Sequence, residues 1–89
     1  MEVEQTFVIP NEQGLHARAA TRLVQTLSRF RAEVELEKAG QRADGKSIVE
    51  VLMLVASKGS TVHVRSRGEE AHAALAALDG LIRARFGEH

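Results

Sequence analysis

The sequence contains no cysteine, so it can form neither disulfide bonds nor metal sites built on thiolates. It also lacks an excess of charge of either sign, because 12 basic residues balance 12 acidic ones. Proteins whose main partner is a nucleic acid usually carry a basic excess, so this balance argues against that class. No stretch approaches the ~20 apolar residues that span a bilayer, and residues 1–4 lack the pattern of a signal peptide. We therefore expect a cytoplasmic protein with no membrane partner.

What the chain does have is enough length for one small domain. Its 89 residues suit a single unit, residues 1–89, and they contain no internal repeat, low-complexity tract or linker. A domain of this size buries roughly 60–65% of the surface that its unfolded chain exposes. We expect a modest stability that needs no disulfide or metal to support it.

Two kinds of apolar spacing predict the secondary structure. Alternation with polar residues predicts four strands, at residues 2–9, 32–37, 41–43 and 61–66. Apolar residues at helical spacing predict three helices, at residues 17–29, at residues 48–55 and from residue 69 to residue 85. The element order is therefore β-α-β-β-α-β-α. Because the hairpin around Gly40 is antiparallel, the economical arrangement is an α+β domain of two layers, an antiparallel sheet with all helices on one face.

The second predicted helix is more apolar than a surface helix needs to be. Ser47 followed by Glu50 matches a capping box, which marks where this helix begins. On a helical wheel, its buried face consists of Ile48, Val51, Leu52 and Val55. Val49 and Met53 lie well off that face, so they are either the edge of the core or a docking patch for a partner. In the last predicted helix, the buried stripe is Ala71, Ala74, Leu75, Leu78 and Ile82, with Phe86 as a further candidate.

The candidate functional residue is His16, which stands in the segment Gly14-Leu15-His16-Ala17-Arg18 directly before the first predicted helix. This segment places it at or next to the N-cap. Unpartnered backbone N–H groups and the positive end of the helix dipole favour an anion there. The same dipole disfavours a positive charge on the ring, and a neutral ring nitrogen is a nucleophile. We therefore predict that His16 is transiently phosphorylated, with Arg18 and the N–H groups holding the phosphoryl group.

Simpler roles remain open for these residues. A histidine at this position could equally serve as a polar N-cap, although Arg18 two residues later favours a site for an anion. A metal site is not expected, because no second histidine or carboxylate stands at ligand spacing near His16. The histidines His63 and His72 are expected to face solvent. Ser47 has an ordinary role as a helix cap, and its hydroxyl at a helix N-terminus would also tolerate a phosphate.

The motif Gly14-Leu15-His16-Ala17-Arg18-Ala19-Ala20, followed by Lys46-Ser47-Ile48 and then Lys58-Gly59, resembles the HPr family, the histidine-containing phosphocarriers of the bacterial phosphotransferase system. The resemblance covers nearly the whole chain. It implies an open-faced β-sandwich, in which four antiparallel strands in the order 1-4-2-3 carry three helices on one face. It also implies a carrier rather than an enzyme, one that needs no cofactor and acts as a monomer.

The resemblance implies a role for each residue at the start of the first helix. His16 would accept a phosphoryl group on Nδ1 from enzyme I, which phosphoenolpyruvate charges, and would pass it to an enzyme IIA domain. Arg18 would stabilise the charge in transfer, and the backbone amides of Ala17 and Arg18 would be the nearby donors. Ser47 matches the regulatory serine that HPr kinase/phosphorylase modifies. The docking surface that matches the family consists of Ala20, Thr21, Val49, Leu52 and Met53.

Two departures from the family pattern leave the pathway open. Ala19 stands where the family usually has proline, and Glu12-Gln13 makes the preceding loop longer than in many members. The protein could serve sugar uptake, or it could be a regulatory binding module of a nitrogen-related or carbon-control branch that docks on target proteins. A third alternative is an acylphosphatase-like hydrolase, for which Asn11 would be the residue that positions water.

Overall fold

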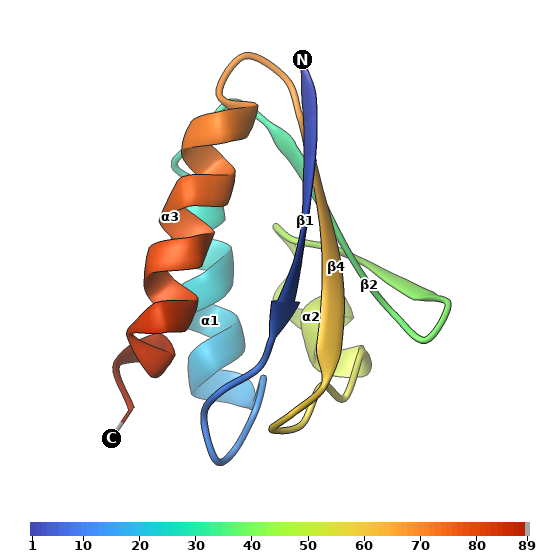
Figure 1. Ribbon diagram of the computed structural model, residues 1–89, viewed down its shortest axis with the longest axis vertical. Coiled ribbons are helices and arrows are strands. Elements are labelled where there is room, and N and C mark those ends of the chain that lie inside the picture. Colours follow the sequence, from blue (N-terminus) through green and yellow to red (C-terminus); the bar gives the residue numbers. More distant parts are fainter. Residues whose placement is uncertain (89) are drawn as a thin grey trace.

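The computed structural model describes residues 1–88, and His89, the last residue of the predicted domain, lies outside the described residues. Within this range, four strands form one antiparallel sheet with the order β1-β4-β2-β3 (Figure 1). The strands are β1 (Glu2–Val8), β2 (Glu33–Lys38), β3 (Gln41–Asp44) and β4 (Thr61–Arg67). One face of the sheet carries the helices α1 (Ala17–Leu27), α2 (Ile48–Met53) and α3 (Ala71–Arg83). The predicted α+β fold with strand order 1-4-2-3 is confirmed.

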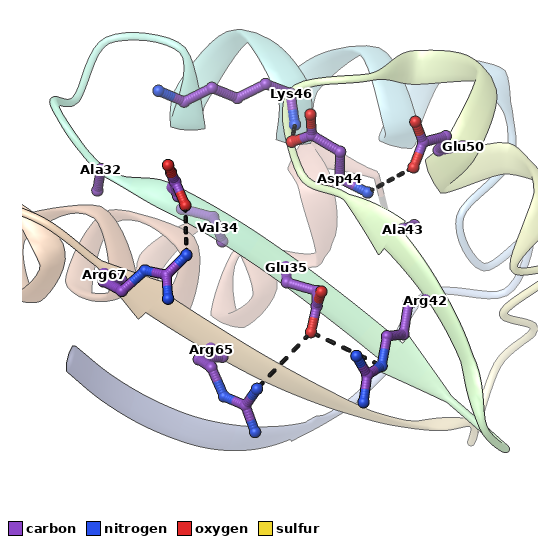
Figure 2. Close-up of a pocket in the computed structure, with 11 residues that line it drawn as sticks. Ala32, Val34, Glu35, Arg42, Ala43, Asp44, Lys46, Glu50, Arg65 and Arg67 are labelled. Carbon is purple, nitrogen blue, oxygen red and sulfur yellow. Dashed lines mark hydrogen bonds and ion pairs between the residues drawn. The ribbon is translucent and has the colours of Figure 1, made fainter.

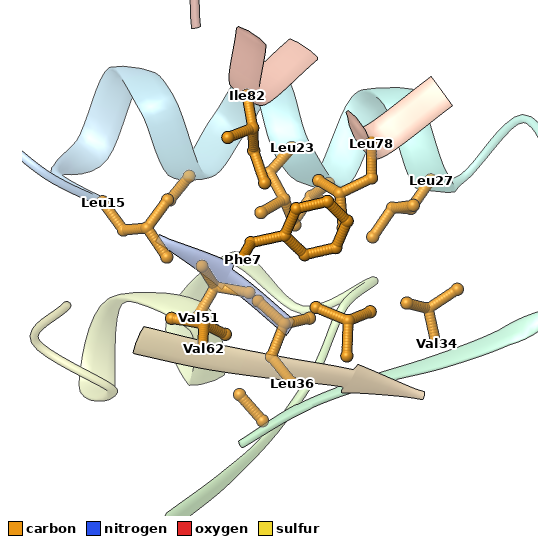
Figure 3. Packing of buried hydrophobic residues seen from close by; sticks show 14 of the residues in the cluster. Phe7, Leu15, Leu23, Leu27, Val34, Leu36, Val51, Val62, Leu78 and Ile82 are labelled. Carbon is orange, nitrogen blue, oxygen red and sulfur yellow. The ribbon is translucent and has the colours of Figure 1, made fainter. Parts of the chain in front are cut away.

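The sheet turns an apolar side towards the helices because apolar and polar residues alternate along its strands. Phe7 of β1 lies opposite Val62 of β4, and Leu36 of β2 lies opposite Val64. Figure 3 shows this layer packed against the buried side chains of α1 and α3, which include Leu23, Leu27, Leu78 and Ile82. Each such side chain contributes about 1.5–3 kcal/mol when it is fully buried. This layer therefore holds α1 in place, and with it the segment that precedes α1.

The predicted buried face of α2 is wrong in three of its four residues. Val51 is buried, but Ile48, Leu52 and Val55 are exposed, and Leu54 is buried in their place. For Val55 the cause is the early end of α2, because the helical wheel assumed a helix that continued to residue 55. Ile48 and Leu52 lie within α2, which turns Val51 towards the core and leaves these two at its exposed edge. Val55 instead has a φ of 51°, which takes the chain off the helical path. The short helix leaves an apolar surface in contact with solvent.

A tight turn with left-handed backbone follows α3. This helix ends two residues before the predicted end and is followed by the 3₁₀ turn η1 (Arg85–Gly87), in which all three residues have φ values between 53° and 76°. The predicted core residue Phe86 is fully buried, and the guanidinium of Arg22 in α1 donates a hydrogen bond to its carbonyl oxygen. This anchored turn carries Glu88 back to the beginning of α1.

Candidate functional site

The loop between β1 and α1 fixes the position of His16. Gly14 has a φ of 62°, and a Cβ added there would lie 2.7 Å from the Cα of Ser57, so only glycine fits. The next residue, Leu15, is buried, and its N–H donates a hydrogen bond of 2.8 Å to the carbonyl of Ala56. The backbone directly before His16 is thus pinned against the segment that follows α2.

His16 is the N-cap of α1, as predicted. Its backbone is extended, with φ −75° and ψ 179°, and its ring nitrogen Nδ1 accepts a hydrogen bond of 3.4 Å from the N–H of Arg18. The side chain is 25% exposed, so a visiting protein can reach the ring. The first N–H groups of α1 have no partner within the helix and point towards the same place. The predicted elements of an anion site are therefore together.

The other ring nitrogen of His16 has a partner that the sequence analysis missed. Nε2 contacts Oε2 of Glu88, 72 residues further along the chain. The side-chain amide of Asn11 donates a hydrogen bond of 2.9 Å to Oε1 of Glu88 and one of 2.8 Å to the carbonyl of Gly14. The hydrogen bond from Asn11, followed by that from His16, lowers the pKa of Glu88 below its usual value. A carboxylate therefore does lie near His16, and no local spacing could reveal it.

These contacts determine which ring nitrogen carries the proton. An ionised carboxylate can only accept hydrogen bonds, so Nε2 must be the donor to Glu88. A backbone N–H can only donate, so Nδ1 must present its lone pair to Arg18. Two independent partners thus favour the same tautomer, an assignment inferred from the hydrogen-bond network. The ring therefore has its lone pair on Nδ1, where it accepts the hydrogen bond from Arg18.

A depression of about 310 Å³, which we name the α1 hollow, lies beside this network. It is lined by Asn11, Glu12, Gln13, Arg18, Arg85, Gly87 and Glu88. Arg18 was predicted as the residue that neutralises a phosphoryl group, and the turn after α3 adds the guanidinium of Arg85 to the same hollow. Glu12 is held by Lys58 at 2.6 Å. Two guanidinium groups next to a helix N-terminus provide a setting for an anion.

The predicted docking residues fall into two groups. Val49, Leu52 and Met53 form an exposed apolar surface on α2, which we name the α2 patch, and α2 packs against α1. Thr21 is half-buried on α1, and its hydroxyl donates a hydrogen bond of 2.7 Å to the carbonyl of Ala17. Ala20 is fully buried, so its prediction as a docking residue is wrong. It lies on the face of α1 that packs into the core, where no partner can reach it.

Ser47 caps α2, although the predicted capping box is only half formed. Its hydroxyl accepts a hydrogen bond of 3.2 Å from the N–H of Glu50. The carboxylate of Glu50 does not reach back to the N–H of Ser47. It accepts a hydrogen bond of 3.0 Å from the N–H of Asp44. The N–H of Ser47 bonds instead to the carbonyl of Asp44, because the turn from β3 places that carbonyl within reach. The hydroxyl is only partly covered.

Two further histidines complete the comparison with the predicted sites. His72 is exposed, as expected. His63 lies on the polar face of the sheet but is only half-exposed, because its Nε2 lies 2.6 Å from Oε1 of Glu4 and its Nδ1 lies 3.2 Å from the hydroxyl of Thr6. No group of three or more potential ligands that could hold a metal ion occurs within residues 1–88.

Known proteins are similar to this chain in sequence and in fold. The family model described as "PTS HPr component phosphorylation site" matches residues 3–84. The phosphocarrier protein HPr of Xylella fastidiosa strain 9a5c is 42% identical over 86 residues, which cover 97% of each chain. The phosphocarrier protein NPr of Shewanella violacea is 38% identical over 87 residues, covering 98% of this chain and 96% of that protein.

A solved structure agrees over the same length. The crystal structure of HPr from Thermoanaerobacter tengcongensis superposes with a TM-score of 0.94 at 38% identity and covers 98% of both chains. Fold and sequence therefore lead to one assignment. The chain belongs to the HPr family of phosphocarrier proteins, which carry a phosphoryl group and are not themselves enzymes.

Proposed function

We propose that this protein accepts a phosphoryl group on Nδ1 of His16 from enzyme I, which phosphoenolpyruvate charges, and passes it to an enzyme IIA domain. The observation that carries the proposal is the state of the His16 ring. The ring caps α1, it is open to a partner, and its hydrogen bonds leave Nδ1 as the atom with the lone pair.

The chemistry asks little of the carrier beyond position and charge. Phosphoryl transfer passes through a loose, in-line transition state in which charge spreads over three oxygens. The lone pair of Nδ1 forms a bond to phosphorus while the bond between phosphorus and the donor breaks. The N–H groups of Ala17 and Arg18 and the guanidinium of Arg18 face the place where this charge collects. Transfer to the acceptor follows the same path in reverse.

Docking would use the α2 patch together with Thr21. An exposed apolar surface next to the reacting residue suits several partners in turn, because small interfaces with fast dissociation favour shuttling.

No helix of residues 1–88 is long and apolar enough to cross a bilayer. The cytoplasmic location and the monomeric state stay predictions.

Ser47 is the candidate site of regulation by HPr kinase/phosphorylase. Its partly covered hydroxyl stands at the N-terminus of α2, where a phosphate would interact favourably with the backbone N–H groups. A phosphate there would also place negative charge beside the α2 patch, at Ile48 and Val49 next in the chain. Phosphorylation of Ser47 would therefore weaken docking without removing the nucleophile.

A second candidate is a role in a nitrogen-related branch rather than in sugar uptake. The similarity to phosphocarrier protein NPr of Shewanella violacea favours keeping it. Both candidates need the same phosphorylated His16, so they differ in the acceptor and not in the site. Phosphoryl transfer from this protein to purified IIA domains of each branch would distinguish them.

The decisive experiment labels the protein with enzyme I and ³²P-phosphoenolpyruvate. We expect label that is lost in acid and stable in base, as phosphohistidine requires, in the wild type and in Ser47→Ala. His16→Ala should fold and take up no label. Substantial labelling of His16→Ala would overturn the assignment of the nucleophile. Release of inorganic phosphate in repeated turnovers without an acceptor would instead favour the hydrolase alternative.

A further inference from the structure

We propose that Glu88 is a positioning residue for phosphoryl transfer: its carboxylate holds the N–H of His16 Nε2, keeps the lone pair on Nδ1 and stabilises the positive charge that the ring gains on phosphorylation. The proposal rests on the function proposed above and adds a residue to it. The contact joins His16 at the start of α1 to Glu88, the last described residue, which follows η1.

The position of Glu88 is built into the fold. Phe86 is fully buried, and its carbonyl accepts the hydrogen bond from Arg22 in the middle of α1. The turn is closed by a hydrogen bond of 2.9 Å from the N–H of Gly87 to the carbonyl of Ala84 and by another of 2.9 Å from the N–H of Glu88 to the carbonyl of Arg85. Glu88 therefore reaches His16 from an anchored turn.

The carboxylate is also held in one orientation. Its Oε1 accepts from the amide of Asn11, and its Oε2 faces His16. Asn11 is 2% exposed, and its amide donates to the carbonyl of Gly14 as well, so the amide cannot turn over without losing two acceptors. The side chain of Glu88 is 17% exposed, which keeps bulk water from screening most of its interaction with the ring.

The transfer step gives this contact a chemical role. When the lone pair of Nδ1 bonds to phosphorus, the donor keeps the electron pair of the broken bond, and the proton on Nε2 stays in place. The phosphorylated ring then carries a positive charge delocalised towards Nε2–H. A carboxylate on that N–H forms a charge-assisted hydrogen bond, which is stronger than the bond to the neutral ring. Glu88 therefore favours the phosphorylated state over the free one.

The test compares Glu88→Gln with Glu12→Gln. Both variants remove one negative charge from the α1 hollow, but Glu12 is held by Lys58 and does not contact His16. The measured quantity is the equilibrium of phosphoryl exchange between enzyme I and this protein. We expect Glu88→Gln to shift it about threefold to tenfold towards the unphosphorylated protein, and Glu12→Gln to shift it by less than about twofold. Equal shifts in the two variants would overturn the proposal.

A spectroscopic measurement separates this role from a structural one and does not need enzyme I. The ¹⁵N NMR spectrum of the neutral His16 ring reports which nitrogen carries the proton. We expect the proton on Nε2 alone in the wild type and in Glu12→Gln, and a population with the proton on Nδ1 in Glu88→Ala. An unchanged ring spectrum in folded Glu88→Ala would overturn the positioning role. If enzyme I labelled none of the proteins, the proposed function would fail, and the ring spectra would still decide the role of Glu88.

Discussion

Two hollows on this molecule differ in size and in the state of their charges. The larger one, which we name the sheet hollow, has a volume of about 640 Å³ and is shown in Figure 2. It is lined by Ala32, Glu33, Val34, Glu35, Arg42, Ala43, Asp44, Lys46, Glu50, Arg65 and Arg67. Its three arginines all face glutamates, with Arg67 2.6 Å from Glu33 and both Arg65 and Arg42 within 4.0 Å of Glu35. The arginines of this surface are therefore neutralised by its own glutamates.

The α1 hollow has about half that volume but keeps positive charge available. Within residues 1–88, Arg18 and Arg85 form no ion pair, and both line the hollow beside His16. In the sheet hollow the three arginines already have glutamate partners, and Lys46 donates a hydrogen bond to the carbonyl of Phe30. Size is therefore a poor guide to function in this fold, and the state of the charges next to a reactive group is a better one.

The largest difference that we expect between the two regions is in how much a glycine-to-alanine substitution lowers the free energy of unfolding. In Gly14→Ala, strain from the positive φ adds to a clash with the backbone near Ala56, so we expect a loss of about 3 kcal/mol or more in the free energy of unfolding. Gly40, in the β2–β3 hairpin beside the sheet hollow, also has a positive φ, but a Cβ there meets nothing within 4 Å. Gly40→Ala should therefore cost about 1 kcal/mol. Urea denaturation measures both, and equal losses would contradict the difference.

The next effect concerns the guanidinium groups. We expect Arg18→Ala to slow phosphorylation by enzyme I about tenfold to a hundredfold, because one of the groups that neutralise the transferring phosphoryl charge is lost. Arg67→Ala removes the same group from the sheet hollow, where Glu33 already neutralises it, and should leave the rate unchanged. Rapid-quench kinetics would measure the rate of phosphorylation by enzyme I in both variants. A rate in Arg18→Ala equal to that in Arg67→Ala would show that unpaired charge is not what distinguishes the α1 hollow.

The features of this molecule that could be predicted from the sequence are those that depend on neighbouring residues in the chain. Alternation of apolar residues placed the inner face of the sheet correctly at Phe7, Val62 and Leu36, because the pleat of a strand is a local property. The N-cap position of His16 was also predictable, since a glycine, an apolar residue and a histidine stand directly before an apolar helical period. Spacing along the chain contained the information in both cases.

The parts that the sequence analysis missed depend on contacts between distant residues. The wheel drawn for α2 misplaced Val55 because that helix ends early, and the positive φ at Val55 has no sequence signal of its own. It misplaced Ile48 and Leu52 because the assembled fold decides which side of this short helix meets the core. The contact between Glu88 and His16 spans 72 residues and exists because η1 packs against α1. Ala20 matched the docking surface by motif alone, whereas packing decides exposure, and packing buries it. Such features follow from the assembled fold.

A smaller effect is expected at the α2 patch, where the loss of an apolar side chain is compared with the same loss elsewhere on the surface. Met53→Ala should raise the KM for this protein as a substrate of enzyme I about threefold to tenfold and leave kcat nearly unchanged, because an exposed apolar contact contributes to docking and not to the transfer step. Val8, at the end of β1, is equally exposed, and Val8→Ala should change neither constant. A similar rise in KM in both variants would mean that the α2 patch has no special role in docking.

The smallest effect concerns acid stability at the sheet hollow. The hydrogen bond from Arg67, with its charge, holds the pKa of Glu33 below its usual value of 4.5. Since the folded pKa is the lower one, this ion pair stabilises the fold fully above pH 4.5, and its contribution disappears as the pH falls through the folded pKa. In Glu33→Gln we therefore expect a shallower fall of the urea midpoint below pH 4.5, and a small one because the pair is exposed. Phosphorylation of His16 at neutral pH should not change, because no residue that lines the sheet hollow also lines the α1 hollow. An acid limb identical to that of the wild type would contradict the role of this ion pair, and a slower phosphorylation would connect the two hollows that the structure keeps apart.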